Sequence, residues 1–115
     1  MIPYGRQEVT DEDIKSVVDV LKSDFLTQGP KIPEFEKKIS DYCGSEYVVA
    51  VSNATAGLHL AALALLDKGD KVLTSPNSFL ATSNAIMYAQ AKPIFVDISE
   101  NGNIDLDLCE EEIKK

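Results

Sequence analysis

The sequence predicts an α/β fold with a mainly parallel sheet flanked by helices. Three segments rich in β-branched and apolar residues are expected as strands, at residues 47–51, 71–74 and 93–98. Helical stretches and short links separate them, and strands that alternate with helices in this way form parallel sheets. Ligands bind beyond the carboxyl ends of such strands, so residues 52–56 and 76–79 are the expected place for a site.

A first helix is expected to begin after Thr10. Thr10 and Asp13 have the spacing of a capping box, in which each side chain bonds the other residue's backbone N–H. Apolar residues then recur at helical spacing, at Ile14, Val17, Val18 and Leu21. This helix should end near Ser23.

A second helix should follow a loop marked by Gly29 and Pro30. Pro33 suits the first position of a helix, where its missing N–H costs nothing. The apolar stripe is Phe35, Ile39 and Tyr42, and Gly44 is a natural helix stop.

The second half of the chain alternates strands with helices. Residues 58–66 are nearly all apolar, which predicts a helix buried on most sides. A turn is expected at residues 68–70, and helices over 80–89 and from Asp105 to the end of the sequence. Three parallel strands with two helices between them would leave a sheet edge and large apolar faces uncovered, so the chain is expected to be part of a larger fold.

Composition excludes several classes of function. The chain has 115 residues and a net charge of −8, so it lacks the basic stripe that nucleic-acid binding needs. Cys43 and Cys109 lie far apart, forming neither a metal motif nor a disulfide framework, which favours a reduced cytoplasmic protein. No signal core or membrane-spanning apolar run is present in the sequence. No metal site and no membrane partner are expected.

The most informative segment is the predicted strand-to-helix junction at residues 47–58. Its turn contains only small and hydroxyl side chains, including Ser52, Asn53 and Thr55. The first N–H groups of a helix are unpaired and carry partial positive charge, so such a junction can hold a phosphate without a basic residue. The alternative is an ordinary helix that Ser or Asn caps.

Other candidates favour a structural interpretation. His59 is the only histidine, but its place in an apolar helix favours a core residue over a general base. Asp97 ends a predicted strand, and a structural role is favoured for it as well. Three lysines sit in turns or at strand starts and are expected on the solvated surface, namely Lys68, Lys71 and Lys92.

Four spaced motifs carry a resemblance to a known family. They are residues 52–59 (SNATAGLH), 68–70 (KGD), 76–85 (PNSFLATSNA) and 91–97 (AKPIFVD). In order and spacing, the chain resembles the DegT/DnrJ/EryC1 family of pyridoxal-phosphate-dependent sugar aminotransferases. Residues 2–7 and 21–30 are similar to the branch that aminates C4 of a UDP-linked 4-keto-6-deoxy-N-acetylhexosamine in pseudaminic acid synthesis.

The resemblance covers the whole chain and implies a fold. It implies the N-terminal portion of the large domain of aspartate-aminotransferase-type (fold type I) enzymes that use pyridoxal 5′-phosphate (PLP). Residues 1–45 would form an N-terminal helical segment with a substrate loop, and residues 46–115 the start of the large PLP-binding α/β domain. Family members are homodimers with active sites at the subunit interface.

The resemblance also implies roles for individual residues. The cofactor phosphate would be held by Ala54, Thr55 and Ala56, and Phe79 would stack on the pyridine ring. Positions near the substrate match Tyr4, Asp24, Phe25, Leu26, Thr27 and Asn53. No catalytic residue is expected within this chain, because the family's aldimine lysine and the aspartate on the pyridine nitrogen lie beyond Lys115.

The resemblance implies transfer of an amino group from glutamate to the UDP-linked keto sugar. One alternative is another nucleotide-sugar aminotransferase or a PLP-dependent sugar dehydratase, in which histidine replaces the aldimine lysine. A second alternative is a non-catalytic truncated fragment that binds a phosphate ligand or docks to a full-length partner.

Overall fold

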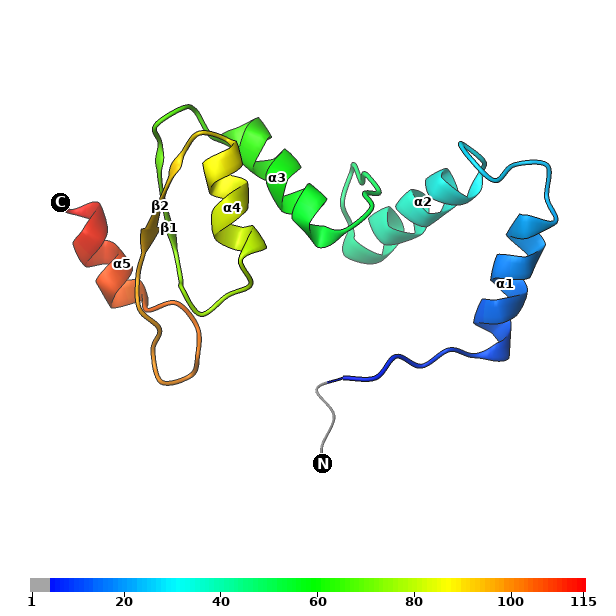
Figure 1. The fold of residues 1–115 in the computed structure, drawn as a ribbon, viewed down its shortest axis with the longest axis horizontal. Coiled ribbons are helices and arrows are strands. Elements are labelled where there is room, and N and C mark those ends of the chain that lie inside the picture. The colour runs from blue at the N-terminus through cyan, green and yellow to red at the C-terminus, as the bar shows by residue number, and fades with distance from the viewer. Residues whose placement is uncertain (1–4) are drawn as a thin grey trace. The chain divides into compact units, whose positions relative to one another are not determined.

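The computed structural model describes residues 5–115, so the prediction for Tyr4 lies outside the described residues. The chain forms two compact units, and the boundary between them in the sequence lies between Ala50 and Val51. The first unit contains helices α1 and α2, and the second contains α3, β1, α4, β2 and α5 (Figure 1).

Helix α1 spans Asp11–Leu21 and confirms the predicted capping box. The Asp13 N–H donates to Thr10 Oγ1 at 3.2 Å, and the Thr10 N–H donates to Asp13 Oδ2 at 2.8 Å. Two amides that the helix itself leaves unpaired thus have acceptors, which fixes the start of the helix. The C-cap is Lys22, next to the predicted end.

The capping box should make α1 sensitive to acid. Hydrogen bonds from the Thr10 backbone and hydroxyl lower the pKa of the Asp13 carboxyl below its ordinary value of 3.8. A carboxyl with a lowered folded-state pKa contributes stability above its unfolded pKa and loses it as pH falls through the folded one. We therefore expect α1 to fray from its N-terminus in that acidic range. An NMR titration of Asp13 in wild type and Thr10→Ala measures this, and equal titration midpoints would contradict the expectation.

Helix α2 spans Lys31–Cys43 and begins earlier than predicted. Pro30 is its N-cap, so Pro33 occupies the third helical position and the prediction of a first position was wrong. The early start is tolerated because first-turn N–H groups have no acceptor within the helix, so proline loses no bond there. Gly44 ends the helix in a left-handed conformation, φ 69°, as predicted.

The strand predicted at residues 47–51 was wrong. No strand pairs with this segment anywhere in residues 5–115, and Tyr47 and Val49 are exposed. A β-branched run becomes a strand only where a neighbour accepts its hydrogen bonds. The segment is instead tied to α2, since the Ala50 N–H donates to Glu36 Oε1 at 2.8 Å.

The second unit contains the predicted parallel strand pair. Strand β1 (Lys71–Thr74) lies beside β2 (Lys92–Phe95), with Lys71 opposite Lys92 and Thr74 opposite Phe95. The predicted strand 93–98 is shorter than expected. It ends at Phe95, and Ile98 forms only an isolated antiparallel bridge with Ile104.

Small side chains form the packing between the helices and the sheet. Helix α3 (Ala54–Leu65) packs on α4 (Ala81–Tyr88), which covers both strands. The buried residues of this unit are Ala62, Thr74, Ala81, Ala85, Ile86, Ala89, Ala91 and Val96. The expectation that helix 58–66 is buried on most sides was wrong for the described residues. Leu60 and Leu65 are 52% and 81% exposed, because among the described elements only α4 packs closely on α3 and its other sides stay open.

Tight turns close the remaining links. The predicted turn at residues 68–70 is present, with the Asp70 N–H donating to the Asp67 carbonyl at 3.1 Å. The last helix, α5, spans Leu106–Ile113, and the Asp105 carboxylate caps it by accepting from two first-turn N–H groups. This confirms the helix predicted from Asp105.

The topology brings two helix starts to one end of the sheet. Helix α4 connects two parallel strands, so it runs against them and begins at their carboxyl ends. Helix α3 precedes β1 through a tight turn, and the helix begins toward that same end (Figure 1). The two segments singled out by the sequence, 52–56 and 76–79, therefore lie toward the carboxyl end of the strands.

Candidate functional site

Asn53 forms the cap of α3 at the predicted phosphate-binding junction. Its Oδ1 accepts from the Ala56 N–H at 2.9 Å, and its Nδ2 donates to Ser52 Oγ at 3.1 Å. The N–H of Gly57 bonds the Asn53 carbonyl at 3.3 Å. Within residues 5–115, the N–H groups of Ala54 and Thr55 have no hydrogen-bond partner. The structure thus shows a capped helix that still offers two unpaired donors.

Phe79 lies in the turn between β1 and α4, with its side chain 80% exposed. It borders a hollow of about 220 Å³ whose other lining residues are Ser75, Pro76, Ser78, Leu80, Thr82, Ser83 and Phe95. Aromatic rings and hydroxyl groups together suit a flat ligand with polar edges. Sequence reasoning missed Thr82 and Phe95. Phe95 joins the hollow because β2 ends opposite the end of β1.

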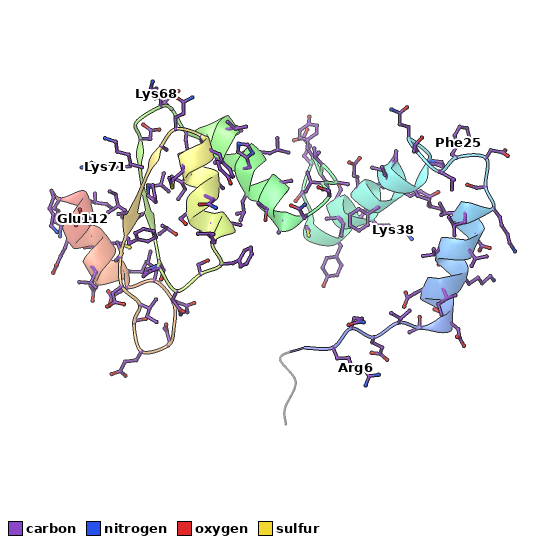
Figure 2. All side chains as sticks on the ribbon, in the orientation of Figure 1. Arg6, Phe25, Lys38, Lys68, Lys71 and Glu112 are labelled. Atoms are coloured by element: carbon purple, nitrogen blue, oxygen red, sulfur yellow. The ribbon has the colours of Figure 1, made fainter. Side chains whose placement is uncertain are left out.

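The three lysines that the sequence places in turns or at strand starts lie away from this end of the sheet. Figure 2 labels Lys68 and Lys71 at the opposite end, where the strands begin. Lys92 pairs with Lys71 in the sheet register and therefore lies there too. All three therefore lie at the end of the sheet opposite to the carboxyl ends of the strands.

The predicted substrate loop lies in the N-terminal unit. Phe25, Leu26 and Thr27 line a hollow of about 420 Å³ formed with the end of α1 and the start of α2, whereas Asp24 is not among the lining residues. Gly29 is required there, because a Cβ atom on it would lie 2.8 Å from Phe25 Cβ. Asn53 belongs to the second unit, and Tyr4 to the residues that the structure does not describe.

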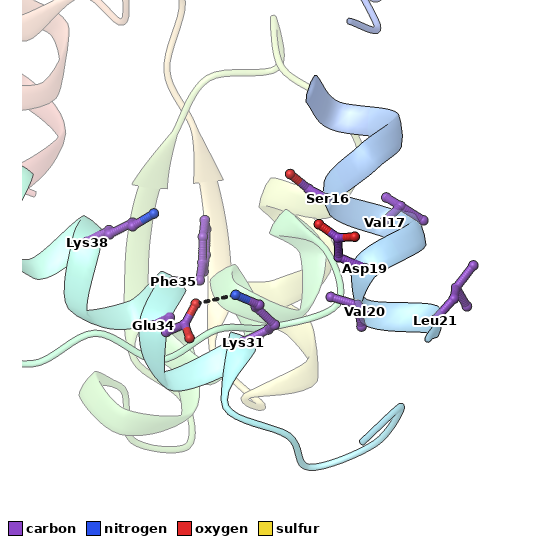
Figure 3. Close-up of a pocket in the computed structure, with 9 residues that line it drawn as sticks. All are labelled: Ser16, Val17, Asp19, Val20, Leu21, Lys31, Glu34, Phe35 and Lys38. Atoms are coloured by element: carbon purple, nitrogen blue, oxygen red, sulfur yellow. Dashed lines mark hydrogen bonds and ion pairs between the residues drawn. The ribbon is translucent and has the colours of Figure 1, made fainter. Parts of the chain in front are cut away.

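A larger hollow of about 550 Å³ lies between α1 and α2 (Figure 3). Its apolar wall includes Val17, Leu21 and Phe35, all more than half exposed. Lys31 Nζ contacts Glu34 Oε2 at 2.7 Å across its rim, and this ammonium lowers the pKa of the Glu34 carboxyl. The hollow contains none of the predicted site residues.

His59 and Asp97 have structural contacts. The half-buried His59 ring packs edge-on against Tyr88, with centroids 5.3 Å apart. Asp97 Oδ1 accepts from the Ile98 N–H at 2.8 Å, and its carbonyl accepts from the Asp105 N–H. Both contacts agree with the structural roles favoured from the sequence.

Metal-ligand clusters and membrane-spanning helices are absent from the part of the chain that the structure describes. In residues 5–115, no three His, Cys, Asp or Glu side chains are grouped as metal ligands, and no helix is long and apolar enough to cross a membrane. Cys43 and Cys109 are free thiols.

The structural matches define the class of protein. They identify this parallel strand pair and its helices as the N-terminal portion of the large domain of an aspartate-aminotransferase-type, fold type I enzyme. The Helicobacter pylori aminotransferase PseC, involved in the biosynthesis of pseudoaminic acid, matches with a TM-score of 0.88 and 29% identity over 95% of this chain. An E. coli GDP-4-keto-6-deoxy-D-mannose-3-dehydratase with bound hydrated PLP matches with a TM-score of 0.86 and 28% identity over 95% of this chain. The match covers 30% of each of those two chains.

Residues 7–115 match the DegT/DnrJ/EryC1/StrS aminotransferase family, and the chain belongs to this family. A curated relative is the UDP-4-amino-4,6-dideoxy-N-acetyl-beta-L-altrosamine transaminase of Campylobacter jejuni subsp. jejuni. It is 43% identical over 105 residues, which are 91% of this chain and 28% of the relative. The chain thus spans less than a third of the length of this relative.

Proposed function

We propose that this chain is the N-terminal part of a PLP-dependent nucleotide-sugar aminotransferase. The enzyme would transfer an amino group from glutamate to C4 of a UDP-linked 4-keto-6-deoxy-N-acetylhexosamine, as in pseudaminic acid synthesis. The observation that carries the proposal is family membership over residues 7–115, together with 43% identity to the Campylobacter transaminase.

The start of α3 fits the phosphate of the cofactor. Ala54 and Thr55 offer unpaired N–H groups in residues 5–115, and the exposed Thr55 hydroxyl can add a donor. The positive end of the helix dipole favours an anion there. The proposed phosphate site therefore consists of the Ala54 and Thr55 N–H groups. The Ala56 N–H would join them only after its bond to Asn53 Oδ1 breaks.

Phe79 fits the flat ring of the cofactor, which supplies an electron sink when bound. The exposed ring borders a hollow at the same end of the sheet toward which α3 begins. This chain would hold the phosphate, orient the ring and exclude water from one of its faces. Proton transfer would fall to residues outside the chain, since no lysine of the second unit's sheet lies at this end.

The N-terminal residues would contribute to substrate binding. The proposed division assigns residues 1–45 to a helical segment with a substrate loop, and residues 46–115 to the large PLP-binding domain. A nucleotide sugar needs hydroxyl and amide partners, which Tyr4, Asp24, Thr27 and Asn53 could provide beside Phe25 and Leu26. The side-chain amide of Asn53 would then have to bind the substrate while its Oδ1 also accepts the Ala56 N–H in the helix cap. We also propose a cytoplasmic homodimer, with active sites at the subunit interface.

Phe79→Ala should weaken PLP binding while Phe79→Trp should be tolerated. Alanine removes an aromatic stacking contact worth about 0.5–1.5 kcal/mol, or roughly a 2- to 12-fold change in the dissociation constant, and it also admits water. Tryptophan keeps a flat apolar face. The measurement is PLP affinity and melting temperature of the three forms of the intact enzyme. Because Phe79 is 80% exposed, the alanine variant should melt close to wild type. An alanine variant with unchanged affinity but a much lower melting temperature would make Phe79 a packing residue.

A sugar dehydratase is the second candidate function. The observation in its favour is the 28% identity to the E. coli dehydratase, over 95% of this chain. The coding sequence after residue 115 separates the two. A lysine at the family's cofactor-linking position supports the aminotransferase, and a histidine supports the dehydratase. A stop codon directly after residue 115 supports a non-catalytic fragment. Formation of 2-oxoglutarate from glutamate and the UDP-4-keto sugar by the intact protein tests the activity itself.

A further inference from the structure

Helix α4 begins without a side-chain cap on its backbone. Its N-cap residue is Leu80, which has no side-chain acceptor, and no cap hydrogen bond is present. Two hydroxyl groups bridge the start of the helix instead, since Ser78 Oγ and Thr82 Oγ1 lie 2.8 Å apart. The Thr82 N–H also donates to the Phe79 carbonyl at 3.0 Å. In the sequence, Phe79 thus lies between two residues whose side chains are hydrogen-bonded to each other.

The hydroxyl pair lies in the same hollow as the Phe79 ring. Since that ring is 80% exposed, packing alone restrains it little, and the backbone of the turn must set its direction. A ring held ready for a ligand loses less conformational entropy on binding than a freely moving one. A hydrogen bond that spans Phe79 can provide this restraint.

We propose that Ser78 and Thr82 are positioning residues for Phe79. Their hydrogen bond holds the β1–α4 turn so that the Phe79 ring is presented to the flat face of an aromatic ligand. The inference rests on the proposed function, in which that ligand is the pyridine ring of PLP. The pair acts through the Phe79 backbone, whose carbonyl accepts from Thr82, and neither residue is assigned a proton-transfer role.

A double-mutant cycle with Phe79 tests the inference in the intact enzyme, with PLP as the probe. Thr82→Val removes the hydroxyl but keeps the shape, and we expect roughly 2- to 12-fold weaker PLP binding, the range for one neutral hydrogen bond. Thr82→Ser should restore wild-type affinity. In a Phe79→Ala background, Thr82→Val should cause no further loss. An equal loss in both backgrounds would show that Thr82 does not act through Phe79 and would overturn the inference.

Ser99→Ala is the matched control, because the Ser99 hydroxyl also bonds a nearby side chain, Asn101 Oδ1 at 2.8 Å, but Ser99 lies outside the hollow. It should leave PLP affinity unchanged. Amide hydrogen exchange without cofactor provides an independent readout. Exchange of the residue 82 amide, which donates to the Phe79 carbonyl, should rise in Thr82→Val and Ser78→Ala but not in Ser99→Ala, with melting temperatures confirming that each variant folds.

The two readouts separate failure of the inference from failure of the proposed function. If the wild-type enzyme binds no PLP, the proposed function is wrong, and a rise in exchange restricted to Thr82→Val and Ser78→Ala still supports the positioning pair. If exchange is the same in all variants, the pair does not hold the turn and the inference is overturned, whatever the affinity for PLP.

Discussion

Thr55→Val should weaken PLP binding by about 10- to 150-fold in the intact enzyme. The substitution removes one hydroxyl that would donate to the cofactor phosphate, and a hydrogen bond to a charged group is worth about 1.5–3 kcal/mol. Valine keeps the shape of threonine and the N–H group of residue 55. The loss should therefore reflect the hydroxyl rather than a changed helix start.

Equilibrium titration with PLP measures this effect, and two variants control it. Thr55→Ser keeps the hydroxyl and should bind within a few-fold of wild type. Asn53→Ala removes the cap from the Ala56 N–H. It should lower the stability of α3 by about 1 kcal/mol, the usual cost of a lost cap. An unchanged dissociation constant for Thr55→Val would mean that this helix start is only capped and does not bind phosphate.

The 115-residue chain alone should show no transaminase activity. By family resemblance, the cofactor-linking lysine and the aspartate on the pyridine nitrogen lie beyond Lys115. Lys71 and Lys92, the lysines of the sheet, lie at the end remote from α3's start and Phe79. In the proposed site the chain would hold parts of the cofactor, while residues 5–115 place no sheet lysine there to move its protons.

The assay mixes the purified chain with PLP, glutamate and the UDP-4-keto sugar. We expect no 2-oxoglutarate above a control without protein, and no lysine-linked PLP absorbance after dialysis. An intact family aminotransferase run in parallel verifies the reagents. Production of 2-oxoglutarate by the short chain would show that a residue within it carries out the chemistry.

Local patterns predicted the elements whose partners are close in sequence. Three such features are confirmed: the capping box of Thr10 and Asp13, the left-handed helix end at Gly44, and the parallel pairing of β1 with β2. In each case the bonds join residues of one turn or one strand–helix–strand unit. Such contacts follow from spacing and residue type alone.

The structure contradicted the predictions that depended on packing or strand partners distant in the sequence. Residues 47–51 have the composition of a strand, and α3 the composition of a buried helix, but the described residues contain no neighbour for either. The composition of a segment indicates which side chains favour burial. It does not indicate whether another part of the chain is available to pack against them. The exposed Tyr47 and Leu65 are the physical result.

The candidate site was predictable only in part. The sequence indicated the junction at Asn53, Thr55 and Ala56, but capping and phosphate binding use the same N–H groups, so residue types could not separate them. The structure shows that Asn53 takes one of these donors. Thr82 and Phe95 join Phe79 through a helix turn and a strand register that no short motif specifies.

The most direct test of the central claim is a crystal structure of the intact enzyme with PLP. We expect phosphate oxygens within about 3 Å of the Thr55 N–H nitrogen and Oγ1, the usual hydrogen-bond distance, with the Phe79 ring stacked on the pyridine. A phosphate bound elsewhere, with Asn53 still capping an empty α3 terminus and Phe79 facing solvent, would contradict it.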